Sequence, residues 1–314
     1  MGSRILLPEG VIAPLPTPLL HFDKLDIEGL ENLLEHVISA GVSGISILGH
    51  TGEERCLDYR MRQMLISETC NIVNRRIPVF LSISDTSISE SYMLANYAAI
   101  CGVTAMVFSP PYYMTTGQAE LIEFYDELLR IIPLPIILYN IESPTNVKIE
   151  TQTILKLAKH PLVVGLKDSS SNFIYLKRII GDIKKENPDF KLYSSKEEVL
   201  FESTLLGCDG CFAGGANLFP DLYINLYRAA KKNDVQLCQD LQRIVMEINK
   251  TIYSIGHYHS SYLKGIKCAL NLMGILSDDY MAPPFHKFMA PEREQVEKSL
   301  TIILKNKEQW KQTN

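Results

Sequence analysis

One structural unit, a strand-like apolar run followed by a helical pattern, recurs along most of this chain. Three consecutive runs end at Pro110, Tyr139 and Lys167, so the unit repeats at intervals of 29 and 28 residues. Strands that are joined through a helix lie parallel, and a series of such units builds a parallel sheet covered by helices. Eight strand–helix pairs can be assigned, which predicts a closed (β/α)8 barrel, a TIM barrel of the α/β class.

An open, doubly wound sheet is the structural alternative. It usually carries a glycine-rich dinucleotide-binding turn after its first strand, whereas the first strand here leads into the proline-rich segment 15–18. We therefore predict the barrel. Its strands are expected at 11–14, 44–48, 78–83, 105–108, 135–139, 162–166, 191–193 and 210–213, and its helices at 26–40, 58–74, 87–101, 118–131, 150–159, 172–187, 196–206 and from 220 onward.

The strand signals stop at about residue 233. Helical patterns cover 234–253, 262–273 and 291–305, and Pro283-Pro284 interrupts the chain between the last two. We therefore divide the chain into a barrel that carries the active site, residues 1–232, and a C-terminal helical extension, residues 233–314.

The composition is that of a globular protein with a substantial core, with 46% hydrophobic and 21% charged residues. The net charge of -5 gives no basic surface for nucleic acid. No apolar run approaches the roughly 20 residues that cross a bilayer, and the first ten residues lack the features of a signal peptide. We expect a cytoplasmic protein with no nucleic-acid or membrane partner.

Seven scattered cysteines argue against a disulfide framework. Cys208 and Cys211 have the spacing of redox and zinc sites, but a zinc ribbon would need a second such pair and a thioredoxin-like motif would begin a helix. We expect two half-buried thiols in a strand.

Lys167 is the unusual residue among those expected at the C-terminal ends of the strands, where barrels of this kind carry their active sites. It directly follows the apolar run 163–166. Burial there disfavours the charged form of its amine, and a neutral amine is the nucleophile that forms a Schiff base with a ketone. The alternative is a lysine that extends into solvent or pairs with Asp168.

Two further strand ends carry candidate groups. Tyr139 ends the preceding strand, so its hydroxyl is expected near the Lys167 amine, where it would relay protons. Alternatively, it is a rim aromatic whose hydroxyl is satisfied by the protein. The turn Gly49–Glu53 precedes a helix, and its backbone N–H groups suit a carboxylate.

These residues together resemble the dihydrodipicolinate synthase and N-acetylneuraminate lyase family of class I aldolases. The similarity covers nearly the whole chain, and the motifs are spaced as the family spaces them. The motifs are the opening segment 11–18, the turn Gly49–Glu53, Ser109-Pro110-Pro111-Tyr112-Tyr113, Tyr139-Asn140, Gly165-Leu166-Lys167-Asp168-Ser169 and Leu206-Gly207-Cys208-Asp209-Gly210.

The resemblance implies roles for five residues. Lys167 would form an imine with pyruvate or another 2-oxo acid, and Tyr139 would relay protons. Thr51 and the backbone amides of His50 and Thr51 would hold the carboxylate. Tyr113 would cross a subunit interface to complete a neighbour's relay, which implies an oligomer, a homotetramer built as a dimer of dimers.

The sequence departs from the family pattern at two positions. The synthases carry an arginine five residues after the relay tyrosine, where it grips the carboxylate of the aldehyde. Here that position is Pro144, which donates nothing. His50 stands where the family has a relay serine or threonine, and we interpret it either as tuning the acid–base step or as recognising a different second substrate. The alternative is a satisfied histidine at a strand end.

Other positions favour a hydroxylated substrate. Sugar-acid lyases of the family have a hydroxyl residue two positions after the lysine and a pair of carboxylates after strand seven, and Ser169, Glu197 and Glu198 match these positions. Carboxylates in a cleft accept hydrogen bonds from sugar hydroxyls. The alternative is that both glutamates occupy the first turn of a helix. The family's hydroxyl residue after strand eight is Gly214 here, a further position expected to line the substrate.

We therefore predict cleavage of a 2-oxo-3-deoxy sugar acid to pyruvate and an aldehyde, or the reverse addition, as in N-acetylneuraminate lyase. The alternatives within the family are 4-hydroxy-tetrahydrodipicolinate synthase and a dehydratase that uses the same imine. An alternative of another class is a non-catalytic 2-oxo acid binding protein. No cofactor and no metal are expected, because His257 and His259 have no carboxylate near them in sequence.

Overall fold

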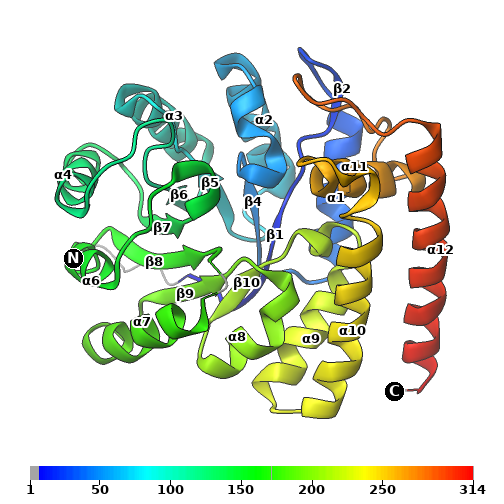
Figure 1. Ribbon diagram of the computed structural model, residues 1–314. Coiled ribbons are helices and arrows are strands. Elements are labelled where there is room, and N and C mark those ends of the chain that lie inside the picture. Colours follow the sequence, from blue (N-terminus) through cyan, green and yellow to red (C-terminus); the bar gives the residue numbers. More distant parts are fainter. Residues whose placement is uncertain (1–6, 171, 314) are drawn as a thin grey trace.

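Eight parallel strands close into a barrel (Figure 1) in the computed structural model, which describes residues 7–170 and 172–313. Strand β1 closes the barrel by pairing with both β4 and β10. The predicted TIM barrel is confirmed. The barrel strands are β1 (Gly10–Pro14), β4 (Gly44–Ile47), β5 (Val79–Ser82), β6 (Ala105–Phe108), β7 (Ile136–Asn140), β8 (Val163–Asp168), β9 (Lys191–Ser194) and β10 (Gly210–Phe212).

Helices cover the outside of the barrel. Several begin at a side chain that accepts a hydrogen bond from an otherwise unpaired amide: Asp26 accepts from the amide of Gly29 at 3.0 Å, and Asp58 from that of Met61 at 2.7 Å. The outer helices are α1 (Ile27–Ser39), α2 (Tyr59–Val73), α3 (Ile88–Cys101), α4 (Gln118–Leu129), α6 (Thr151–Leu157), α7 (Phe173–Glu186), α8 (Leu200–Leu206) and α9 (Pro220–Lys231).

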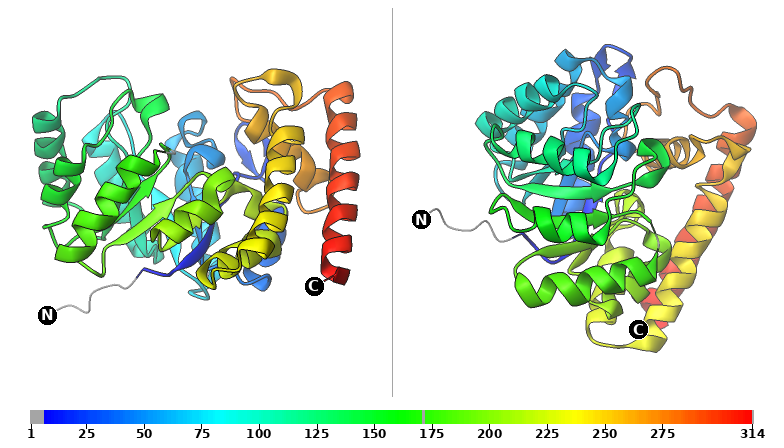
Figure 2. Two further views of the ribbon diagram at one scale, coloured as in Figure 1. Left: turned by 60° about the horizontal axis from the view of Figure 1, so that its bottom comes forward. Right: turned by 60° about the vertical axis from the view of Figure 1, so that its left-hand side comes forward.

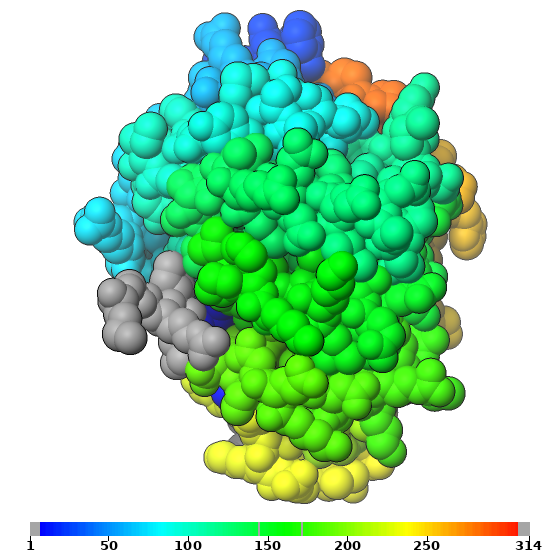
Figure 3. Space-filling model, turned by 90° about the vertical axis from the view of Figure 1, so that its left-hand side faces the viewer, coloured from blue at the N-terminus to red at the C-terminus, as the bar shows by residue number. Residues whose placement is uncertain are grey.

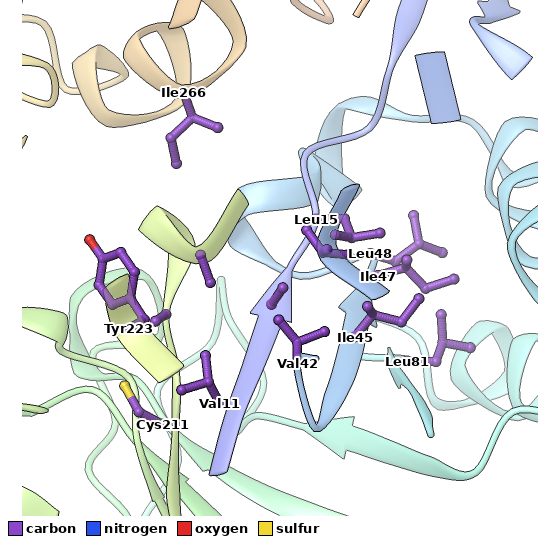
Figure 4. Close-up of a cluster of buried hydrophobic side chains, with 14 of the residues drawn as sticks. Val11, Leu15, Val42, Ile45, Ile47, Leu48, Leu81, Cys211, Tyr223 and Ile266 are labelled. Carbon is purple, nitrogen blue, oxygen red and sulfur yellow. The ribbon is translucent and has the colours of Figure 1, made fainter. Parts of the chain in front are cut away.

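The apolar core has two parts, because successive side chains of a strand point to opposite faces. Outward-facing side chains pack against the helices, and Figure 4 shows Val11, Ile45 and Leu81 of three neighbouring strands in this part. The inward-facing part fills the barrel, which is therefore a packed core. It consists of Leu7, Ile12, Phe80, Ala105, Val107, Ile137, Tyr139, Tyr193 and Phe212.

The C-terminal extension packs onto the barrel. Helices α10 (Val235–Thr251) and α12 (Ala290–Thr313) contact each other and run side by side along one flank (Figures 1 and 2). Helix α11 (Ser261–Leu272) contacts the 3₁₀ turn Gly214–Asn217 that follows β10. Figure 4 shows Ile266 of α11 pointing toward the barrel. The extension thus reaches the C-terminal ends of the strands.

The flank opposite α12 is covered by the chain from α3 to α7 (Figure 3). Among the described residues, no helix combines the length and the apolar character needed to cross a membrane.

The structure differs from the predicted elements in several places. Strand β8 continues to Asp168, so Lys167 lies within the strand and not after it. The predicted helix 196–206 is a 3₁₀ turn, Glu197–Val199, followed by α8. Unpredicted elements are the hairpin of β2 (Leu19–His21) and β3 (Lys24–Leu25) and the short helix α5 (Glu142–Thr145). These elements are too short to show a periodic pattern in the sequence.

The prediction for the cysteine pair needs a correction. Only Cys211 lies in a strand, while Cys208 precedes β10, and both thiols are free and fully buried instead of half-buried. Burial raises the pKa of the Cys208 thiol to about 12, which makes it unreactive as a thiolate near neutral pH.

Candidate active site

Lys167 lies inside the barrel near the C-terminal ends of the strands, and 6% of its surface is exposed. Its Nζ atom is 4.0 Å from the centroid of the Tyr139 ring and 4.6 Å from that of Phe212. Within the described part of the chain, no hydrogen bond or ion pair involves this amine. The carboxylate of Asp168 is engaged elsewhere, because it accepts hydrogen bonds from Asn140 Nδ2 at 2.7 Å and Ser170 Oγ at 2.9 Å. The amine therefore neither extends into solvent nor pairs with Asp168.

Strand register places three side chains in one inward layer. Lys167 of β8 is paired with Tyr139 of β7 and with Tyr193 of β9. The hydroxyl of Tyr193 donates to the carbonyl of Pro8 at 2.7 Å, which closes the barrel from the other end. A substrate would thus reach the amine from the C-terminal ends of the strands, as is usual for this fold.

The Tyr139 hydroxyl is connected to a chain of hydroxyl groups. It accepts a hydrogen bond from Ser169 Oγ at 3.2 Å, and Ser169 Oγ is itself hydrogen-bonded to Ser195 Oγ. Ser195 Oγ also donates to the carbonyl of Asp168 at 3.2 Å. Ser169 was predicted to bind substrate, and here its hydroxyl contacts the predicted relay residue directly. Ser195 was not predicted.

The turn Gly49–Glu53 follows β4 and contains the 3₁₀ segment His50–Gly52. Thr51 is buried, and the carbonyl of Gly52 accepts a hydrogen bond from Thr17 Oγ1 at 2.6 Å, which fixes the turn against the segment after β1. The amides of His50 and Thr51 donate to no backbone carbonyl among the described residues. These N–H groups are therefore free to bind an anion.

The C-terminal extension contacts this turn through hydrogen bonds and an ion pair. The hydroxyls of Thr51 and Tyr262 are 3.2 Å apart and hydrogen-bonded. The carboxylate of Glu53 forms an ion pair with Lys267 and accepts a hydrogen bond from the amide of Ala282 at 2.8 Å. Tyr262, Lys267 and Ala282 all belong to the extension, so part of the candidate site lies outside the barrel sequence. None of these three residues was predicted as part of it.

His50 opens the same turn with an exposed side chain. Although its surface is exposed, protein crowds the ring on its inner side. This partial loss of water lowers the pKa of the imidazole, and the positive charges of Lys167 and Arg55 lower it further. A largely neutral imidazole near neutral pH both donates and accepts hydrogen bonds, as the predicted tuning role requires.

The two predicted carboxylates lie in different surroundings. Glu197 is buried, both of its oxygens accept from the amide of Gly215 at 3.2 Å, and Tyr253 donates to Oε1 at 3.5 Å. Burial raises the pKa of Glu197 to about 7. Glu198 is half-buried and accepts from Asn249 Nδ2 at 2.7 Å. A sugar hydroxyl would have to displace protein donors to reach Glu197, whereas Glu198 keeps some accessible surface.

The adjacent tyrosines of the loop after β6 also differ. The guanidinium carbon of Arg55 lies 3.6 Å from the centroid of the Tyr112 ring. Tyr113, in contrast, is 91% exposed and has a left-handed φ of 87°. Within one chain Tyr113 does not pack against the core, so its predicted role depends on a second subunit.

Glu54 is a half-buried acid near the site, and the sequence analysis did not identify it. Its Oε2 atom has no hydrogen-bond partner among the described residues. Burial raises the pKa of Glu54 to about 7, although the charges of Arg55 and Lys167 oppose this effect. It was not singled out because it falls between the predicted strand 44–48 and the predicted helix 58–74, where a glutamate is usually solvated.

No group of three or more His, Cys, Asp or Glu side chains in the described residues is arranged to hold a metal ion. His257 and His259 both lie in the segment between α10 and α11. The expectation that no metal is needed stays a prediction.

The sequence model of the Dihydrodipicolinate synthetase family matches residues 7–303. The chain belongs to this family. Its members are lyases, and this protein is accordingly an enzyme of the class I pyruvate aldolase group.

The names of individual relatives refer to more than one activity. A protein of Escherichia coli (strain K12) named probable 2-dehydro-3-deoxy-D-pentonate aldolase is 27% identical over 93% of this chain and 96% of its own length. The structure of dihydrodipicolinate synthase from the commensal bacterium Bacteroides thetaiotaomicron is 49% identical, with a TM-score of 0.91 over 95% of this chain and 99% of that chain.

A further solved relative was determined with a ligand. It is a prophage protein of E. coli K12 from the dihydrodipicolinic acid synthase family in complex with pyruvate, with 26% identity and a TM-score of 0.88 over 94% of this chain and 98% of that chain. The family is therefore established, while the names of its members leave the second substrate open.

Proposed function

We propose that this protein is an aldolase that binds pyruvate as a Schiff base on Lys167. One observation carries the proposal: a buried primary amine lies between two aromatic rings, without a counter-ion among the described residues. Because no ion pair among the described residues engages it, this amine is available to attack a ketone. The E. coli prophage protein that was solved with pyruvate supports the choice of 2-oxo acid.

The proposed reaction uses only groups of this site. The Lys167 amine attacks the ketone of the 2-oxo acid, and loss of water gives an imine whose protonated form withdraws electrons. The hydroxyl of Tyr139 accepts the proton of the substrate C4 hydroxyl as the C3–C4 bond breaks, which releases the aldehyde and leaves an enamine on Lys167. Protonation at C3 and hydrolysis then release pyruvate and restore the amine.

The hydroxyl chain behind Tyr139 suits this proton transfer. When Ser195 donates to the Asp168 carbonyl, Ser169 can donate to Ser195 and accept from Tyr139. In the opposite arrangement, Ser195 donates to Ser169, and Ser169 donates to the Tyr139 oxygen. Tyr139 can therefore give and take a proton while its oxygen keeps a hydrogen-bond partner.

For the second substrate we propose an uncharged, hydroxylated aldehyde, so that the cleaved compound is a 2-oxo-3-deoxy sugar acid. Ser169 and the half-buried Glu198 offer hydrogen bonds to hydroxyl groups. Glu197 and Glu198 would repel a second acidic substrate to the extent that they are ionised. The pentonate aldolase name of the E. coli relative agrees with this class.

A second candidate is 4-hydroxy-tetrahydrodipicolinate synthase, favoured by the likeness to the B. thetaiotaomicron synthase. Proline at position 144, where the synthases carry an arginine, weighs against it.

The test is to compare pyruvate release from a panel of 2-oxo-3-deoxy sugar acids with condensation of pyruvate and aspartate semialdehyde. Sugar-acid cleavage at least 100-fold more efficient supports the lyase, the reverse ratio supports the synthase, and no turnover of either kind supports a 2-oxo acid binding protein.

We further propose that a second subunit covers Tyr113, in an assembly of two dimers. The nearly full exposure of this tyrosine in one chain supports an interface at the loop after β6. Sedimentation of the wild type should give a tetramer, and Tyr113→Asp should give a smaller species. Sedimentation of the wild type as a monomer at micromolar concentration would contradict the proposal.

A further inference from the structure

The hydroxyl of Tyr262 occupies an unusual position. Tyr262 belongs to α11, yet its oxygen lies 3.2 Å from Thr51 Oγ1, a residue 211 positions earlier in the chain. Its side chain is only partly buried, whereas Leu263 and Ile266 on the same helix are buried. Tyr262 therefore brings a hydroxyl group from the C-terminal extension to the turn that is proposed to bind the carboxylate.

Gly214 makes room for this tyrosine. A Cβ atom added at position 214 would lie 1.7 Å from the Tyr262 oxygen and 2.8 Å from its Cζ atom. No side chain fits there unless the tyrosine moves. The hydroxyl group that the sugar-acid lyase pattern places at position 214 is thus replaced in space by a hydroxyl from the C-terminal extension.

The pairing of the two hydroxyls supplies an extra donor. If Tyr262 donates to Thr51 Oγ1, the threonine proton is free to point toward a bound carboxylate. If Thr51 donates instead, the phenolic O–H is free. Burial raises the pKa of Tyr262 far above neutral pH, so the phenol keeps its proton in either arrangement.

We propose that Tyr262 is a further substrate-binding residue of this enzyme: together with Thr51, its hydroxyl binds the carboxylate of the 2-oxo acid, in the space that Gly214 leaves open. This inference rests on the proposed function, because it assigns a partner to the pyruvate carboxylate. It also gives the C-terminal extension a direct part in substrate binding.

The neighbouring Tyr253 provides a matched control. Its ring lies 4.8 Å from that of Tyr262, centroid to centroid, but its hydroxyl donates to Glu197 Oε1 and not to Thr51. Removing this second hydroxyl changes the same aromatic pair without changing the contact to the turn.

The experiment measures how fast cyanoborohydride fixes pyruvate on Lys167 as the pyruvate concentration is varied. Tyr262→Phe should raise the half-saturating pyruvate concentration about fivefold, as expected for the loss of one hydrogen bond. It should leave the rate at saturating pyruvate within about twofold. Tyr253→Phe should leave both values unchanged. An unchanged half-saturating concentration in Tyr262→Phe would overturn the inference, whereas a wild type that fixes no pyruvate would overturn the proposed function instead.

A second variant pair tests the role of Gly214. Gly214→Ala should displace Tyr262 and raise the half-saturating concentration at least as much as Tyr262→Phe does. In a Tyr262→Ala background the same substitution should add less than about twofold, because the clash is gone. Equal effects of Gly214→Ala in both backgrounds would show that position 214 acts independently of Tyr262.

Discussion

Lys167 and Lys267 are both buried at the upper end of the molecule, but their surroundings are opposite. Lys267, on α11, is 1% exposed, forms an ion pair with Glu53 and donates to the carbonyl of Tyr280 at 2.7 Å. Lys167, in β8, lies against the rings of Tyr139 and Phe212 and has no counter-ion in the described residues.

This difference shows that burial alone does not make a lysine a nucleophile. Burial lowers the pKa of Lys267, but the nearby charge of Glu53 opposes the shift, and the pair joins the turn Gly49–Glu53 to the extension. An amine that is committed to an ion pair keeps its proton and serves the structure. An amine that faces aromatic rings and takes part in no ion pair is available to react.

Replacing Lys167 should have the largest effect, and this effect should be on activity and not on stability. Lys167→Met should reduce pyruvate release by about 10⁴-fold or more, because the covalent step is lost. Its thermal midpoint should match or exceed that of the wild type, since no buried partner is left unpaired. Steady-state kinetics and calorimetry check the two parts. Residual activity within 100-fold of the wild type would break the distinction between the two lysines.

Replacing Lys267 should affect stability instead. Lys267→Met leaves the Glu53 carboxylate buried without its cation, and it should lower the free energy of unfolding by about 3–5 kcal/mol. The double variant Glu53→Gln/Lys267→Met should recover most of this loss. Denaturant unfolding measures both values. A single-variant loss below about 1 kcal/mol would mean that the pair does not hold the turn.

Glu197 extends the comparison to a buried acid that accepts hydrogen bonds from protein donors and, among the residues that the structure describes, has no ion-pair partner. Its pKa is raised by burial to about 7, so the folded state holds this proton more tightly than the unfolded chain does. The associated stability is fully present below about pH 4.5 and is lost as the pH rises through 7.

Glu197→Gln should therefore gain stability relative to the wild type between pH 5 and pH 8, by about 2 kcal/mol. The exposed Glu202 on the neighbouring helix gives a control, because Glu202→Gln should change the stability difference little over this range. Unfolding curves at both pH values measure the effect. A stability difference that does not change with pH would contradict the raised pKa.

Replacing Ser169, which contacts the Tyr139 hydroxyl beside Lys167, should have the smallest effect of these substitutions. Ser169→Ala removes the donor to the Tyr139 oxygen and should lower turnover about tenfold, while fixation of pyruvate stays within about twofold. Ser170→Ala is the matched control, because Ser170 Oγ bonds Asp168 and not Tyr139. Equal losses in both variants would show a general disturbance of the loop.

The sequence allowed the barrel and the Lys167–Tyr139 pair to be predicted because both depend on local signals. Strand and helix periods fix where strands end, and parallel strands bring their C-terminal ends to one rim. The Tyr262–Thr51 contact has no such signal, since it joins residues 211 positions apart through the docking of α11. The direction of a side chain in an irregular segment is also hidden in the sequence. Glu197 was therefore expected in the pocket, but its carboxylate is buried against Gly215.

The most direct test of the central claim is reduction with cyanoborohydride in the presence of pyruvate, followed by intact mass and peptide mapping. The structure predicts one reduced pyruvate adduct per chain, on the peptide that contains Lys167, and none in the folded Lys167→Met variant. Lys267 should remain unmodified. If the folded wild type carries no adduct on Lys167 while a known class I aldolase is modified under the same conditions, the Schiff-base account is wrong.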